Sequence, residues 1–207
     1  MSFLHLSKTK FATAEQAYQD YVALITAFKQ AGWQQYFRPW NARIAKEDNV
    51  KILTYDNPDD VPDDRYVFNT RFSSDSLTPL TFEEWQYMIA KQEKDGYGFV
   101  FNSNLYLRDI VVWIKISPFE TKPNPISGQP DLKYYQVRYE FNTAKYDFYR
   151  SIRGETIEEL KQEYDDEYET DKRVRQDEED TAIRAGFRID ESYQDPDMWQ
   201  YIIEPAY

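Results

Sequence analysis

The segment LYLRDIVVWIKIS, residues 105–117, decides the fold that this sequence predicts. Its second half, Ile110–Ile116, is rich in β-branched residues and almost continuously apolar, which is typical of a central strand covered on both faces. We expect a strand over 105–117 to pair with a shorter one over 99–101, across a turn at 102–104. This hairpin would form the middle of a sheet.

Other segments with strand character lie before and after this hairpin, at 50–55, 66–72, 134–141 and 145–152. We expect the last two to pair across a turn at 142–144. The acidic loop 56–64 lacks the central glycine and distal glutamate of an EF-hand, so it is predicted to be solvated rather than to bind a metal. Prolines and a glycine in 117–131 predict a long loop there.

Three helices are predicted to begin at capping boxes, in which a threonine is followed three residues later by Gln or Glu: Thr13–Gln16, Thr81–Glu84 and Thr156–Glu159. Apolar stripes with helical spacing extend these starts to helices over 13–31, 81–94 and 155–185. An aromatic cluster over 33–40 is expected to pack, and the apolar end over 199–203 to dock on the body. The prediction is an α+β fold in one domain, 1–207: a mainly antiparallel sheet packed by about three helices, including a long acidic C-terminal helix.

The third helix carries most of the net charge. Residues 155–180 hold 13 carboxylates and 4 basic side chains, a charge of -9 out of -12 for the whole chain. Such a concentration repels itself and adds nothing to a core, so it indicates either a solvated helix face or a partner of opposite charge. Apolar residues nearly vanish over 169–180, so this half is expected to project into solvent or to be mobile.

Composition excludes several classes of function. The chain has no cysteine, and its one histidine, His5, lies near the chain start, which excludes thiolate chemistry and leaves no histidine for a catalytic triad inside the fold. No phosphate-binding glycine motif and no apolar run long enough to span a membrane is present. We expect no cofactor, no metal and no catalysis. A carboxylate-based glycoside hydrolase is the enzymatic alternative, since acids and aromatic residues are abundant.

Two stretches resemble a known family. Residues 21–40, with Ala31-Gly32-Trp33-Gln34-Gln35-Tyr36 and Arg38-Pro39, and later Leu80-Thr81-Phe82-Glu83-Glu84-Trp85, are similar to proteobacterial immunity proteins encoded beside type VI secretion effectors. The resemblance covers about the first 100 residues. It implies stoichiometric inhibition of a cognate toxin without catalysis, and it assigns no functional residues.

The candidate function is therefore that of a protein-binding inhibitor. Its partner would be a cognate toxin or another basic protein, since the acidity disfavours nucleic acid and anionic membrane. The expected partner-binding residues all lie on the acidic helix: Glu158, Glu159, Glu163, Tyr164, Asp165, Asp166, Glu167, Tyr168 and Glu169. A nucleic-acid mimic that blocks a DNA-binding enzyme is the alternative. A cytoplasmic location is expected, or a periplasmic one if a signal peptide has been removed, and the oligomeric state is left open.

Overall fold

The computed structural model describes residues 11–48, 76–95, 101–151 and 154–203. Its centre is a four-stranded antiparallel sheet in the order β1-β2-β3-β4. The strands are β1 (Gln34–Gln35), β2 (Phe101–Leu107), β3 (Ile110–Lys122) and β4 (Leu132–Thr143). The helices are α1 (Ala14–Gln30), α4 (Phe82–Asp95), α5 (Ala144–Ser151), α6 (Ile157–Arg184) and α7 (Trp199–Ile203), with a short 3-10 turn at Lys46–Asp48. The predicted α+β class is confirmed.

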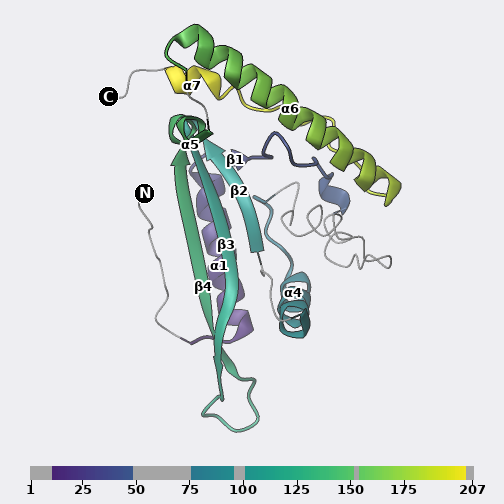
Figure 1. Cartoon of the computed structure of the whole chain (residues 1–207). Coiled ribbons are helices and arrows are strands. Elements are labelled where there is room, and N and C mark those ends of the chain that lie inside the picture. Colours follow the sequence, from purple (N-terminus) through teal and green to yellow (C-terminus); the bar gives the residue numbers. More distant parts are fainter. Residues whose placement is uncertain (1–10, 49–75, 96–100, 152–153, 204–207) are drawn as a thin grey trace.

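Helices α1 and α4 cover one face of the sheet (Figure 1). Helices α5, α6 and α7 lie together at one end of the strands. Alternation along β3 separates two cores: Val112 and Ile114 pack with Tyr21 of α1 and Trp85 of α4, whereas Val111 packs with the group around α5 and α7. Trp85 is fully buried and stacks on Tyr21. The hairpin β2–β3 therefore occupies the middle of the sheet, as predicted.

The predicted helix starts are confirmed. Each capping box forms, with the threonine hydroxyl and the side chain three residues later exchanging hydrogen bonds with the backbone. The three helices run over 14–30, 82–95 and 157–184, within two residues of the predicted ends. The C-terminal segment also docks as expected, since Met198 and Ile202 are buried against α5 and α6.

The predicted turn at 102–104 is wrong, because β2 continues through it and the hairpin turns at Arg108 and Asp109. Polar residues inside the strand suggested a turn, but the side chains of Asn102 and Ser103 are buried and hydrogen-bonded. Asn102 accepts a hydrogen bond from the Trp113 indole, and Ser103 is bonded to Ser76. Arg108 takes a positive φ of 55°, which the sequence did not signal.

The predicted loop 117–131 is too long, because β3 runs to Lys122 and β4 begins at Leu132. Pro118 lies in the ladder beside a register shift, a position that tolerates a missing backbone N–H. Only 123–131 connects the strands.

The predicted strand at 145–152 is wrong as well, because this segment forms helix α5. Ala144 and Phe148, four residues apart, are buried while Tyr146 between them is exposed, so the burial pattern is helical. The hydroxyl of Thr143 accepts a hydrogen bond from the Tyr146 backbone and caps the helix start. The predicted strands at 50–55 and 66–72, the loop 56–64, and residues 99–100 lie outside the described residues.

Gly154 sits where α6 begins, and it leaves no room for a side chain. A Cβ there would lie 2.9 Å from the backbone nitrogen of Leu160 and 3.1 Å from Cβ of Glu159. We expect Gly154→Ala to lower the free energy of unfolding by about 1–2 kcal/mol, because the first turn of α6 must shift. Urea denaturation, with exposed Glu155→Ala as the control, checks this. Equal stability of the two variants would contradict it.

Candidate functional site

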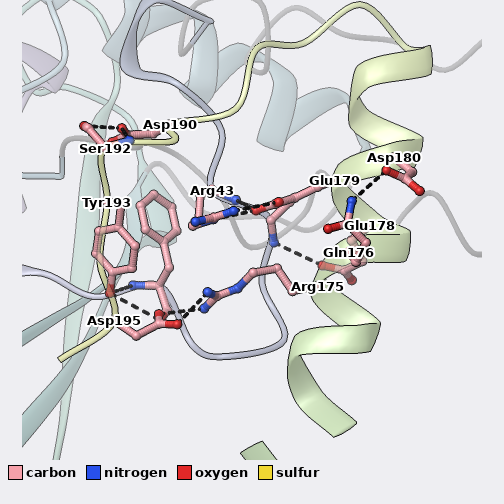
Figure 2. A network of polar contacts seen from close by, with 12 residues as sticks. Arg43, Arg175, Gln176, Glu178, Glu179, Asp180, Asp190, Ser192, Tyr193 and Asp195 are labelled. Carbon is pink, nitrogen blue, oxygen red and sulfur yellow. Dashed lines mark hydrogen bonds and ion pairs between the residues drawn. The ribbon is translucent and has the colours of Figure 1, made fainter. Parts of the chain in front are cut away.

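The C-terminal half of α6 is held to the body by buried ion pairs (Figure 2). Arg175, only 5% exposed, donates from Nη1 and Nη2 to the two carboxylate oxygens of Asp195 at 2.7 and 2.9 Å, and from Nη2 to the Arg38 carbonyl at 2.9 Å. One turn later Glu179, 4% exposed, accepts from Nε and Nη2 of Arg43 at 2.7 and 2.9 Å. The Arg43 backbone N–H donates to Glu179 as well, at 3.1 Å.

A third ion pair, between Asp48 and Arg188, joins residues 36–48 to residues 187–195. Asp48 accepts from the backbone N–H of Arg188 at 2.6 Å and from its Nη2 at 2.7 Å, and Asp48 is buried while Arg188 is exposed. Ile44 forms a β-bridge with Ile189 beside it. Residues 36–48, α6 and 187–195 thus form one layer joined by two-pronged Arg–carboxylate contacts, the strong form of this interaction.

The expectation that 169–180 projects or is mobile is wrong. The segment is helical throughout and packs through Arg175 and Glu179 instead of through apolar side chains. Its one apolar residue, Val174, is 44% exposed. A search for apolar residues cannot detect docking through charged side chains. Local spacing does not reveal the pair either, because Arg43 and Glu179 are 136 residues apart in the chain.

The structure divides the nine predicted site residues between two sides of α6. Tyr164 and Tyr168 turn toward the body and stack on one another with ring centroids 6.0 Å apart. Six of the predicted carboxylates are exposed: Glu158, Glu159, Glu163, Asp166, Glu167 and Glu169. We call the exposed carboxylates opposite the body the acidic ridge: Glu158, Asp166, Glu169, Asp177 and Asp180. The predicted tyrosine anchors are therefore not part of this ridge.

Several of the predicted carboxylates already have intramolecular contacts. Glu159 accepts from the backbone N–H groups of Glu155 and Thr156 and belongs to the capping box. Asp165 pairs with Lys161, and Glu169 pairs with Lys172 at 2.8 Å. These last two pairs are exposed and worth little, so both carboxylates remain accessible to a partner.

A cavity of about 420 Å³ lies beneath the inner face of α6, between α5, α7 and residues 36–40. Five aromatic residues line it: Tyr36, Trp40, Phe148, Tyr164 and Tyr168. Four carboxylates line it as well: Asp147, Glu167, Asp171 and Asp195. The cavity therefore contains three of the nine predicted site residues, Tyr164, Glu167 and Tyr168. Tyr36 and Trp40 come from the aromatic cluster 33–40, which was expected to pack, and sequence patterns did not single out the remaining groups as site residues.

Burial governs the protonation behaviour of the cavity. It raises the pKa of Asp171, and the neighbouring charge of Glu167 raises it further while Arg175 opposes this. Burial also raises the pKa of Tyr36 to about 12, and that of Tyr168, whose hydroxyl donates to Asp195 at 2.8 Å. The Tyr36 hydroxyl makes no hydrogen bond with any residue that the structure describes. The cavity thus favours a guest that supplies positive charge or a hydrogen-bond partner.

Comparison of the chain with protein-family models, with curated proteins and with solved structures finds no match. The residues behind the resemblance to immunity proteins have structural roles here: Gly32 follows α1 with a φ of 83°, and Trp85 is fully buried. Within the described ranges, no helix is long and apolar enough to cross a membrane. The same part of the chain shows no group of three or more acidic, histidine or cysteine residues placed to hold a metal ion.

Proposed function

We propose that this protein is a non-catalytic inhibitor that binds a basic partner protein through the acidic ridge of α6, in the manner of an immunity protein that neutralises a bacterial toxin. The supporting observation is a 28-residue helix, ordered along its length and anchored on one side, that presents carboxylates to solvent on the other. The resemblance of residues 21–40 and 80–85 to immunity proteins agrees with this proposal.

The anchoring of α6 prepares its outer side for binding. The capping box and buried Leu160 hold its start, and the Arg175 and Glu179 ion pairs hold its second half. A helix that is already ordered loses little conformational entropy when a partner arrives, so more of the interaction energy appears as affinity. The exposed carboxylates would also attract a basic surface over a distance and speed the encounter.

Binding fits the cavity better than glycoside hydrolysis does. Glu167 and Asp171 come from successive turns of one helix and approach the cavity from the same side. Hydrolysis of a glycoside places its two carboxyl groups on either side of the scissile bond. The other two lining carboxylates come from other segments and are already engaged: Asp195 by Arg175 and Tyr168, and Asp147 of α5 by a partner of its own.

A second candidate, a nucleic-acid mimic, is favoured by one observation. The acidic ridge is a line rather than a compact patch, because α6 extends for about 42 Å at the usual rise per residue. Such a line could occupy the phosphate-binding track of a DNA-binding enzyme. Competition with duplex DNA separates the two candidates. If this protein is a mimic, duplex DNA displaces it from the partner. If it binds the partner outside the DNA-binding surface, the complex stays intact.

The decisive experiment reverses charge on the ridge. The partner is captured from lysate at low salt, identified by mass spectrometry and purified, and its affinity is measured by calorimetry. We expect Glu158→Lys, Asp166→Lys and Asp177→Lys combined to weaken binding at least about tenfold and to flatten its salt dependence, because fewer charges attract the partner. Inhibition of the partner's activity is measured with the same proteins.

A matched control carries the same change of net charge on other surfaces: Glu15→Lys, Glu120→Lys and Asp131→Lys, all exposed positions. We expect this control to bind nearly as well as the original protein. Equal affinity of the two triple variants would move the interface away from α6. A captured partner whose activity is unchanged in the complex would contradict inhibition.

A further inference from the structure

We propose that the cavity beneath α6 binds an organic cation, a guanidinium or ammonium group on a flexible aliphatic stem, supplied by an arginine or lysine side chain of the basic partner. The inference extends the proposed function, since it adds a specific pocket beside the acidic ridge. It rests on the geometry of the cavity, which can be tested without the partner.

The charges that line the cavity are not balanced. Glu167 and Asp171 are one turn apart on α6, a spacing at which like charges repel. Asp195 is matched by Arg175, and Asp147 has a partner of its own. Among the described residues that line the cavity, the cation is Arg38, which lies 5.3 Å above the Trp40 ring. A second cation placed near Glu167 and Asp171 would relieve their repulsion. It would also return the raised pKa of Asp171 toward its usual range.

The aromatic walls suit the same guest. Cations are attracted to the faces of electron-rich rings, and the rings around this cavity already attract cations of the chain itself. Lys172 lies 5.1 Å from the Tyr168 ring and Lys161 lies 5.9 Å from the Tyr164 ring, although neither lysine lines the cavity. A guest inside would contact the ring surfaces that these lysines leave uncovered.

The size and the polar atoms of the cavity agree with a side chain as guest. At about 420 Å³ it falls at the lower end of the usual range for small-molecule sites, roughly 300–1,000 Å³. The hydroxyl of Tyr36, a largely buried residue on its wall, makes no hydrogen bond with the described residues and could accept one from a guanidinium. Apolar contacts for an aliphatic stem are provided by Met198 and Ile202.

The first test uses butylguanidinium and its uncharged isostere butylurea as probes. Each is titrated into the full chain, and the indole N–H signals of Trp40 and Trp85 are followed by two-dimensional NMR. We expect butylguanidinium to shift the Trp40 signal with a dissociation constant in the range of about 1–10 mM, as for a fragment of this size, and to leave that of buried Trp85 unchanged. Butylurea should bind at least about fivefold more weakly. Equal binding of the two probes, or no shift with either, would overturn the proposal.

Variants locate the effect in the cavity. Glu167→Gln and Asp171→Asn should each weaken the binding of butylguanidinium about fivefold, because each removes one attracting charge from the cavity wall. Asp131→Asn removes the same charge from an exposed position that does not line the cavity and should leave binding unchanged. Equal weakening by all three variants would show a general charge effect and overturn the assignment to the cavity.

The source of the cation is tested with free agmatine and with the blocked tripeptide Gly-Arg-Gly. Binding of the tripeptide at the same Trp40 signal supports a partner side chain as the guest. Binding of agmatine without the tripeptide would overturn that source and leave a free amine in its place. The Trp40 signal reports the cavity and not the acidic ridge. Failure of these probes to shift it would therefore contradict the pocket and not the proposed function, and failure of the ridge variants would contradict the proposed function and not the pocket.

Discussion

Replacing Arg175 by methionine is expected to lower the free energy of unfolding by about 3 kcal/mol, among the largest effects of any single substitution in this chain. Methionine keeps much of the aliphatic stem, so the loss comes from the charge. Asp195, whose side chain is 14% exposed, would keep its negative charge, and among the described residues only the Tyr168 hydroxyl would still donate to it. The carbonyl of Arg38 would lose one donor and keep the backbone N–H of Asn41 at 2.8 Å.

The measurement is urea denaturation, with hydrogen exchange of the α6 amides to show where stability is lost. We expect faster exchange over 170–184 before the sheet is affected, because the second half of α6 depends on this clamp. Arg173→Met, on the exposed side of the same helix, should change stability by less than about 0.5 kcal/mol.

A double variant separates charge from packing. Arg175→Met combined with Asp195→Leu removes both charges, and it should recover most of the lost stability, since an unpaired buried charge costs more than an apolar pair. A double variant as unstable as the sum of the two single ones would contradict this account. It would mean that the clamp acts through packing and not through charge compensation.

Raising the pH above 10 is expected to unfold the protein, through tyrosines that are buried in their neutral form. Burial raises the pKa of Tyr36, Tyr135 and Tyr139 from an ordinary value of 10.0 to about 12. Tyr21 and Tyr164 shift in the same direction. The folded state therefore holds these protons more tightly than the unfolded state does.

The sign of the effect follows from this difference. Below pH 10 both states hold the tyrosine protons and the full stability is present. As the pH rises from 10 to 12, each such tyrosine lowers the free energy of unfolding by about 1.4 kcal/mol per pH unit. Burial lowers the pKa of Lys115 and Lys133 from 10.5, which has the opposite sign, but this gain ends once the unfolded lysines lose their protons near 10.5.

Urea denaturation at intervals between pH 9 and 12, with tyrosinate absorbance recorded on the same samples, checks this prediction. We expect the buried tyrosines to ionise together with unfolding. Tyr135→Phe provides the sharpest variant, because the Tyr135 hydroxyl is buried without a hydrogen bond among the described residues. This change should raise the free energy of unfolding at neutral pH by about 1 kcal/mol. It should also remove the contribution of one tyrosine, about 1.4 kcal/mol per pH unit, from the loss of stability above pH 10. Tyr87→Phe, at a position 38% exposed, should do neither.

Sequence patterns predicted those parts of the fold that depend on near neighbours in the chain. Thr13, Thr81 and Thr156 start helices because each bonds to the backbone only three residues away. The β-branched run over 110–116 predicted a central strand. The errors arose where one polar residue served a distant partner, as with Asn102 inside β2, or where a short segment fitted two periods, as with α5.

The candidate site was predicted only in part, for a related reason. The charge of α6 located the helix and its carboxylates, but not the side of the helix on which each of them lies. Glu167 and Glu169 look alike in the sequence, yet one lines the cavity and the other lies on the ridge. Trp40 and Asp195 complete the cavity from segments far from α6 in the chain, and no local spacing indicated that they would meet there.

By itself, the sequence determined the class of fold, the starts of the three long helices and the concentration of acid on the last of them. Those features depend on capping and periodicity, which act over three or four residues. Only the tertiary structure decided that Arg175 and Glu179 are buried and that Tyr164 and Tyr168 line a cavity. The sequence does not distinguish a charged residue that is solvated from one that pairs with a residue 136 positions away. Its role is therefore decided by the packing of distant segments.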